Sequence, residues 1–131
     1  MNTTDRILGE ARKVRPPTKR EQTDPEWAYR YARMFIKGRF PEGEAAIATN
    51  PDWAYYYASY VIMGRWPEGE AAIATSQHWA CLYAKDVIKG RWPEGEPAMA
   101  KDPYVTKRYL KLYPDAKHEW IMRGWLDWFD L

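Results

Sequence analysis

The sequence predicts an all-α protein, a short α-solenoid of helix-turn-helix repeats in which long and short helices alternate. A tryptophan recurs every 26 residues, at Trp27, Trp53 and Trp79. The tetrapeptide PEGE recurs three times at the same interval. The apolar residues between these marks are spaced as on one face of a helix. Repetition at a fixed interval of this size is typical of a solenoid, in which each unit buries its apolar face against the next.

The repeats divide the chain into an arm and a repeat domain. Unit two reads NPDWAYYYASYVIMGRWPEGEAAIAT, and units one and three follow the same pattern. A fourth copy starts at Asp102 but lacks the GRWPEGE turn, as expected of a solenoid's terminal cap. The predicted parts are a basic N-terminal arm or cap (1–22) and a helical repeat domain (23–131), which contains repeats 24–49, 50–75 and 76–101 and a C-terminal cap (102–131).

Each unit is predicted to open with a long helix. Its first residue carries an oxygen that can accept hydrogen bonds from the amides of the first turn. In three of the units a proline follows, at the first helical position, where no N–H is needed. These residues are Asp24, Asn50, Ser76 and Asp102, and the prolines are Pro25, Pro51 and Pro103. The apolar stripe expected to face the core in unit one consists of Trp27, Ala28, Tyr31, Ala32, Phe35 and Ile36.

The long helix is predicted to end at a glycine. Gly38, Gly64 and Gly90 each follow shortly after the last apolar residue of the stripe. The left-handed conformation that terminates a helix is most easily adopted by glycine. After the turn, the proline of PEGE is expected to start a shorter helix. Its EAAIA or EPAMA segment consists mainly of small residues, which allow close helix approach.

The two ends of the chain depart from the repeat. The first 22 residues are basic and contain a proline pair, and Thr3 or Thr4 is placed to cap a short helix that would cover the first repeat. A solvated terminus is the simpler interpretation. At the other end, Trp125, Trp128 and Phe129 either seal the stack or join two chains as a homodimer. We favour the seal, because solenoid termini need capping.

Composition narrows the function classes. Lysine and arginine number 20 against 18 acids, a net charge of +2 that does not by itself indicate a nucleic-acid binder. Cys81, the single cysteine, forms no internal disulfide, and no secretory signal is recognisable. No apolar stretch approaches the roughly 20 residues of a membrane-spanning helix. We therefore expect a soluble, cytoplasmic protein with no membrane partner.

No constellation of catalytic or metal-binding residues is recognisable. The carboxylates stand mainly at helix starts and turns, where structural roles explain them. His78 and Cys81 are three residues apart, but two ligands do not complete a zinc site. The two glutamates of PEGE would repel phosphate. We therefore expect no enzyme, no cofactor and no metal.

The outer face of the long helix differs between units and is the predicted partner-binding site. In unit two, Tyr56, Tyr60 and Met63 are spaced four and three residues apart, so they share one face. An apolar cluster flanked by cations has the composition of an interaction hot spot. The flanking cations are Arg30, Arg33, Lys37, Lys85 and Lys89. The predicted site consists of Tyr55, Tyr56, Tyr60 and Met63, with Tyr29, Arg30, Arg33, Met34, Leu82 and Lys85 around them. Alternatively, the N-terminal arm or a second copy of the chain covers these tyrosines.

A nucleic-acid interface is the second interpretation. Arg39, Arg65 and Arg91 repeat at one position, where cations could follow a phosphate chain while the next residue, phenylalanine or tryptophan, stacks on bases. The basic residues of the arm would extend this interface: Lys13, Arg15, Lys19 and Arg20. We favour the structural alternative, in which each arginine pairs with a glutamate of its own turn, such as Glu42 or Glu44, and the ring packs in the core.

The segment WAYRYARMFIKGRFPEGEAAIAT resembles the degenerate repeats of poorly characterised proteins of tailed bacteriophages, and the resemblance covers residues 24–101. The architecture is also similar to leucine-rich repeat variants, which alternate long and short helices. The phage resemblance brings no catalytic residues. It implies a viral protein that binds, and modulates or inhibits, a host or defence protein. A non-catalytic protein interaction module is thus the leading hypothesis, with nucleic-acid binding and a structural or scaffold role as alternatives.

Overall fold

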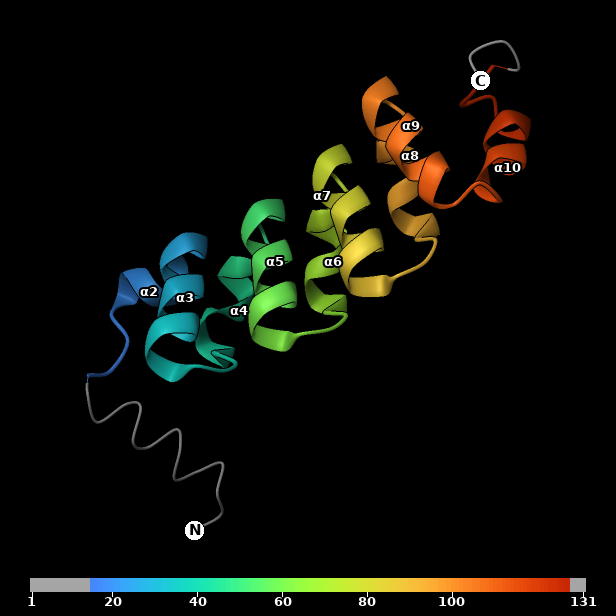
Figure 1. The fold of residues 1–131 in the computed structure, drawn as a ribbon. Helices are drawn as coiled ribbons and strands as arrows, with labels where there is room; N and C mark the ends of the chain where they lie inside the picture. The colour runs from blue at the N-terminus through green and yellow to red at the C-terminus, as the bar shows by residue number, and fades with distance from the viewer. Residues whose placement is uncertain (1–14, 128–131) are drawn as a thin grey trace.

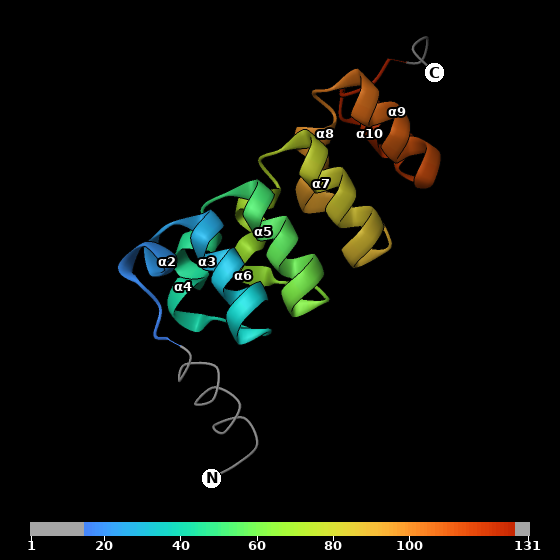
Figure 2. The same ribbon diagram turned by 60° about the vertical axis from the view of Figure 1, so that its left-hand side comes forward.

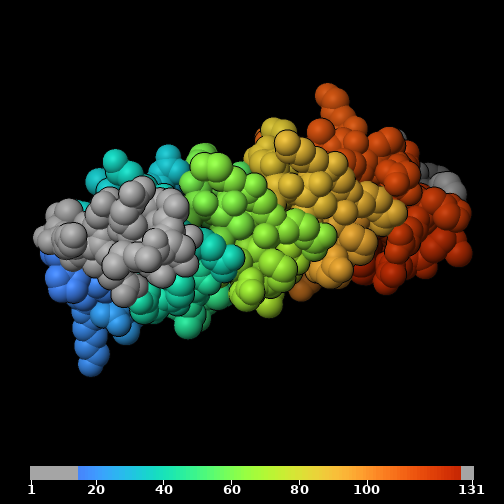
Figure 3. Space-filling model, turned by 90° about the horizontal axis from the view of Figure 1, so that it is seen from below, coloured from blue at the N-terminus to red at the C-terminus, as the bar shows by residue number. Residues whose placement is uncertain are grey.

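The protein is an all-helical repeat stack, as the sequence predicts. The computed structural model describes residues 15–127, and in this range the regular elements are helices. The units follow one another in chain order from α2 at one end to α10 at the other (Figures 1 and 2). The space-filling view shows the same order along the long axis of the molecule (Figure 3). Each unit therefore contacts mainly its neighbours, as in other solenoids.

The long helices form one layer of the stack. They are α3 (Pro25–Tyr31), α5 (Pro51–Tyr57), α7 (Gln77–Tyr83) and α9 (Pro103–Leu112). The first three continue into a π-helical turn each, namely η1 (Ala32–Ile36), η2 (Ala58–Ile62) and η3 (Ala84–Ile88). Successive long helices pack side by side, α3 on α5, α5 on α7 and α7 on α9. Their C-terminal ends therefore lie in a row along one edge of the stack.

The predicted caps begin the long helices. The Asp24 carboxylate accepts hydrogen bonds from the amides of Glu26 and Trp27, at 3.0 and 3.2 Å. Asn50 and Asp102 accept the equivalent pairs, and Ser76 accepts one bond from Trp79. Since each cap satisfies amides that the helix itself leaves unpaired, the start of every unit is fixed locally.

The end of the long helix differs from the prediction. The left-handed residues are Lys37, Met63 and Lys89, with φ of 56°, 61° and 60°, and the glycines follow them. The π-helical turn explains the displacement. In unit three, for example, the amides of both Lys89 and Gly90 donate to the Ala84 carbonyl, at 2.7 and 3.2 Å. The chain reverses one residue before the glycine, so a lysine or methionine adopts the conformation that glycine adopts most easily.

This displacement gives opposite expectations for two adjacent substitutions. Lys89→Gly should raise the free energy of unfolding by up to about 1 kcal/mol, because it removes the left-handed strain at a cost in chain entropy. Gly90→Ala should have little effect, since no atom lies within 4 Å of the added methyl group and φ is not positive. Urea denaturation of both variants measures the two changes. If Gly90→Ala is less stable than the native protein and Lys89→Gly is no more stable, the left-handed residue is Gly90 and not Lys89.

The short helices form the second layer. They are α4 (Pro41–Ile47), α6 (Pro67–Ile73) and, in unit three, η4 (Pro93–Gly95) followed by α8 (Glu96–Met99). Each begins at the proline of PEGE, as predicted. The short helix of unit three starts with a 3₁₀ turn, because Pro97 has no N–H to donate to the carbonyl of Pro93. Each short helix packs on the long helix of its own unit.

The glycine of PEGE is required by a close contact. A methyl group on Gly69 would lie 2.4 Å from the nearest atom of the Trp66 ring, and Gly43 and Gly95 face Phe40 and Trp92 in the same way. These rings are fully buried. The aromatic residue before each PEGE therefore folds back over the glycine, and this contact sets the angle between the turn and the short helix.

Most of the predicted stripe is buried. Ala28, Tyr31, Ala32 and Ile36 face the core, and their equivalents in units two and three are buried or half-buried. Phe35 is exposed, which contradicts the prediction. Its position faces the preceding unit, as Val61 does in unit two, and unit one has no complete unit before it. The Arg15 guanidinium lies over the Phe35 ring instead, at 4.3 Å from its centroid.

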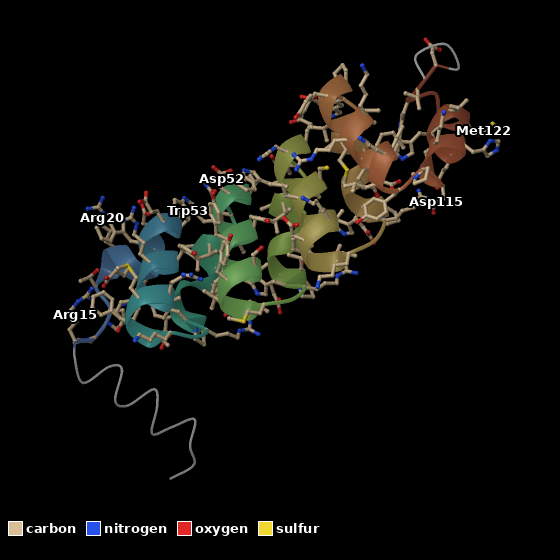
Figure 4. All side chains as sticks on the ribbon, in the orientation of Figure 1. Arg15, Arg20, Asp52, Trp53, Asp115 and Met122 are labelled. Carbon is tan, nitrogen blue, oxygen red and sulfur yellow. The ribbon has the colours of Figure 1, made fainter. Side chains whose placement is uncertain are left out.

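Short segments cover both ends of the repeats. At the N-terminal end, α2 (Lys19–Thr23) begins with a capping box between Thr18 and Glu21 and packs on α3 and α4. At the C-terminal end, α10 (Ala116–Met122) buries Trp120, which stacks on Tyr109 with ring centroids 5.5 Å apart. Figure 4 places Arg15 and Met122 at these opposite ends. The described residues do not include the short helix predicted near Thr3. They also do not include Trp128 and Phe129, which belong to the predicted dimer contact.

Candidate binding surface

The repeated arginines form clasps between units. Arg39 holds Glu44 through two hydrogen bonds of 2.9 Å. Tyr57 of the next unit donates its hydroxyl to the same carboxylate at 2.6 Å and accepts the amide of Phe40 at 2.8 Å. Arg65, Glu70 and Tyr83 repeat this arrangement, as do Arg91, Glu96 and Tyr109. Each clasp therefore fixes the turn of one unit to the long helix of the next.

The clasp shifts the pKa of its members. Burial favours a raised pKa for the Glu44 carboxyl, but the hydrogen bonds from Arg39 and Tyr57 outweigh it and hold that pKa below its ordinary value. Burial, followed by the bond to Glu44, raises the pKa of the Tyr57 phenol. The carboxylate is thus kept charged and the phenol kept neutral, which are the states that the hydrogen bonds require.

The clasps occupy the arginines and aromatic rings on which the alternative nucleic-acid interface depends. All three arginines are paired with glutamates, and Phe40, Trp66 and Trp92 are buried, so no ring is accessible for stacking on a base. The favoured structural alternative is confirmed, with Glu44 and its equivalents as the partners.

The described part of the N-terminal arm is also engaged with the stack. Arg15 forms a two-bond ion pair with Glu21, with both distances 2.6 Å, and this pairing lowers the pKa of Glu21 to about 2. The Arg20 guanidinium lies 4.7 Å from the centroid of the Trp27 ring. Lys19 is exposed on α2, and Lys13 lies outside the described residues. Residues 15–23 therefore form a cap on unit one. Because α2 ends at Thr23, this cap extends one residue beyond the boundary predicted at residue 22.

The aromatic residues of the predicted partner face divide into two groups. Tyr29 packs on Trp53, with ring centroids 5.4 Å apart, and Tyr55 packs on Trp79 at 4.9 Å. Tyr55 is only 6% exposed, and its hydroxyl donates to Asp86 at 2.8 Å. Burial, followed by this bond, raises its pKa to about 12. Tyr55 therefore belongs to the joint between units two and three, and its placement on the outer surface was wrong.

The exposed group lies at the C-terminal end of the long helix. Tyr60 is 48% exposed and Met63 is 79% exposed, and these two residues are called the central ridge below. Met34 of unit one is 65% exposed. Tyr56 is half-buried and stacks on Tyr60, with ring centroids 6.1 Å apart. The ridge is therefore an apolar feature supported from beneath by the joints between units.

A hollow lies on each side of the central ridge. The first hollow, of about 280 Å³, lies toward unit one and is lined by Arg33, Lys37, Gly38, Tyr60, Val61 and Met63. The second hollow, of about 350 Å³, lies toward unit three and is lined by Tyr55, Ser59, Tyr60, Met63, Gly64, Asp86, Val87 and Lys89. Lys37 and Lys89 are two of the cations predicted to flank the cluster, whereas Asp86 was not predicted as part of the site. The left-handed position shared by Lys37, Met63 and Lys89 is the structural feature that brings them to the same rim.

Cations surround the ridge. The Arg33 guanidinium lies 4.8 Å from the centroid of the Tyr60 ring and donates to the Tyr60 carbonyl at 3.2 Å. Arg30, farther back on α3, is paired with Glu26 at 2.7 Å. Lys85 and Lys89 are exposed on the other side, and Leu82 is half-buried. The predicted cationic rim is thus present around Tyr60 and Met63. Within this rim, the charge of Arg30 is paired with Glu26.

Met63 is exposed at a position where the backbone conformation disfavours it. A left-handed residue other than glycine costs roughly 1–2 kcal/mol, and an exposed methionine recovers none of this by burial. Lys37 and Lys89 carry the same strain at the equivalent positions, so the strain belongs to the repeat. Met63 differs from these two lysines in exposing an apolar side chain there.

Within residues 15–127, no group of three or more histidine, cysteine, aspartate or glutamate residues is placed to hold a metal ion. In the same range, no helix is both long and apolar enough to cross a membrane. Cys81 is a free thiol and is buried.

Comparison with known proteins yields no relative from which a site can be transferred: no family model, no curated protein and no solved structure matches this chain.

Proposed function

We propose that this protein is a non-catalytic binding module that uses the central ridge, with the hollows beside it, to hold a protein partner. The observation that carries the proposal is the exposure of Tyr60 and Met63, whereas neighbouring Tyr55 and Tyr57 are buried. An exposed aromatic and a methionine with cations around them match the composition of interaction hot spots.

The nature of the partner follows from the phage resemblance alone. That resemblance supports a small viral protein that acts in the cytoplasm of a bacterial host and modulates or inhibits a host or defence protein. A scaffold role, with homodimers formed through Trp125, Trp128 and Phe129, would place the working surface at the far end of the stack. Binding of nucleic acid would rely on the exposed cations, since the clasp arginines and their neighbouring rings are engaged.

Site-specific crosslinking tests the proposal. A photoreactive phenylalanine analogue replaces Tyr60, and the full-length protein is irradiated in nuclease-treated bacterial lysate. We expect one discrete protein adduct, which is lost when Met63→Asp is introduced in addition. Tyr56 is unsuitable for substitution, because its ring packs on Trp53 and Trp79.

Tyr104 provides the matched control. It is 73% exposed and lies on α9, away from the ridge. The same analogue at Tyr104 should give no such adduct, and circular dichroism should show that all variants are equally helical. Identical adducts from both positions, or an adduct that persists with Met63→Asp, would exclude the central ridge as the binding surface.

A further inference from the structure

We infer that the partner segment held by the central ridge is an acidic amphipathic helix with two large apolar side chains seven residues apart, one for each hollow. This inference rests on the proposed function and specifies the chemistry of its partner. It follows from the spacing of the hollows and from the charges around them.

The spacing comes from the architecture of the stack. One hollow lies between units one and two and the other between units two and three, with the Met63 side chain between them. Packed helices are spaced about 8–10 Å apart, so the hollows are separated by approximately one such interval. Seven residues of an α-helix span about 10 Å and return to the same face. A helix lying across the row of long-helix ends therefore presents residues i and i+7 to the two hollows.

The charges select an acidic helix. Arg33 and Lys37 line the first hollow and Lys89 lines the second. Among the residues that line the two hollows, Asp86 is the only acid, and it accepts a hydrogen bond from Tyr55. Glutamates or aspartates on the partner, beside its two apolar residues, would face these cations and increase both specificity and association rate.

A peptide fits these features better than a nucleic acid does. Met63 is the most exposed part of the ridge and offers no aromatic ring on which a base could stack. Methionine adapts instead to apolar side chains, as at other surfaces that bind amphipathic helices. The Tyr60 ring, which could stack, already contacts Tyr56 and the Arg33 guanidinium.

Fluorescence anisotropy with synthetic peptides tests the inference on the full-length protein. The probe is a labelled helical peptide of about four turns, built from alanine and glutamate with two leucines at i and i+7. The first comparison peptide has its leucines at i and i+4, and the second has lysine in place of glutamate. The fourth probe is a labelled single-stranded oligothymidylate. Each is titrated against the native protein at low and at physiological salt.

The acidic i, i+7 peptide should bind saturably, and the other two peptides should bind at least about tenfold more weakly. Met63→Asp should abolish binding, Lys37→Glu with Lys89→Glu should weaken it and reduce its salt dependence, and Tyr104→Asp should leave it unchanged. Equal binding of all peptides, or tighter binding of the oligothymidylate, overturns the inference. If no peptide binds while the crosslink at Tyr60 still forms, the acidic-helix inference fails and the proposed function stands. If the crosslink also fails, both are wrong.

Discussion

Glu96→Ala is expected to lower the free energy of unfolding by about 3–5 kcal/mol, the range found when one partner of a buried ion pair is removed. The Glu96 side chain is 2% exposed and accepts hydrogen bonds from three residues. Arg91 provides two of these bonds, the Tyr109 hydroxyl one at 2.6 Å and the Trp120 indole one at 3.0 Å. Without the carboxylate, the indole loses its acceptor inside the core, and Arg91 retains only Glu119.

Glu70→Ala is the matched comparison, because its clasp has the same geometry at a more accessible site. The Glu70 side chain is 16% exposed and accepts bonds from Arg65 and Tyr83. We expect a smaller loss of about 1–3 kcal/mol. Urea denaturation of both variants, with unchanged slopes, measures the difference. A loss for Glu96→Ala no larger than that for Glu70→Ala would show that the bond to Trp120 contributes nothing to stability.

Gly69→Ala should destabilise the protein by about 1–3 kcal/mol, because the added methyl group overpacks the core. The methyl carbon would lie 2.4 Å from the nearest atom of the Trp66 ring, which is buried and cannot move without displacing its neighbours. In addition, the Trp66 amide donates to Tyr83 at 2.9 Å, so a shift of this residue would disturb a clasp as well.

Gly64→Ala separates this steric effect from the general effect of replacing a glycine. Gly64 lies five residues earlier in the chain, in the turn before α6, has no atom within 4 Å of the added methyl group and has no positive φ. The Gly64→Ala variant should be as stable as the native protein or slightly more stable, because alanine has less conformational freedom than glycine in the unfolded chain. If the two variants melt at the same temperature, the ring contact does not constrain residue 69.

The helices and their order follow from signals that are local in sequence. Asp24 and its equivalents satisfy the first-turn amides, the prolines start the helices, and the repeated stripe faces the core, so few long-range contacts are needed to predict them. The last turn of the long helix was mispredicted for a physical reason. Gly38 has the residue type expected at a left-handed position, but the π-helical turn that places Lys37 there has no signature in composition or spacing.

The site was predicted only in part, because exposure depends on the stacking of neighbouring units. Tyr60 and Met63 are exposed as expected, whereas Tyr55, the neighbour of Tyr56 in sequence, is buried by Trp79 of the next unit. A single-helix pattern places Tyr55 on the outside, since the surface that covers it lies one repeat away. Lys37 and Lys89 were expected beside the cluster, but the left-handed position that they share with Met63 was not predicted, because the reversal was assigned to the glycines.

The clasp also gives the stack a polarity. Each unit offers a carboxylate and an aromatic residue's amide to the unit that follows, and it offers a tyrosine hydroxyl to the unit that precedes it. The two ends are therefore chemically different. At the first, Tyr31 donates its hydroxyl to the Arg15 carbonyl, and at the last, Trp120 donates to Glu96. A duplicated 26-residue unit inserted in frame would find a matching hydroxyl on one side and a matching carboxylate on the other, so the array can grow in one orientation only.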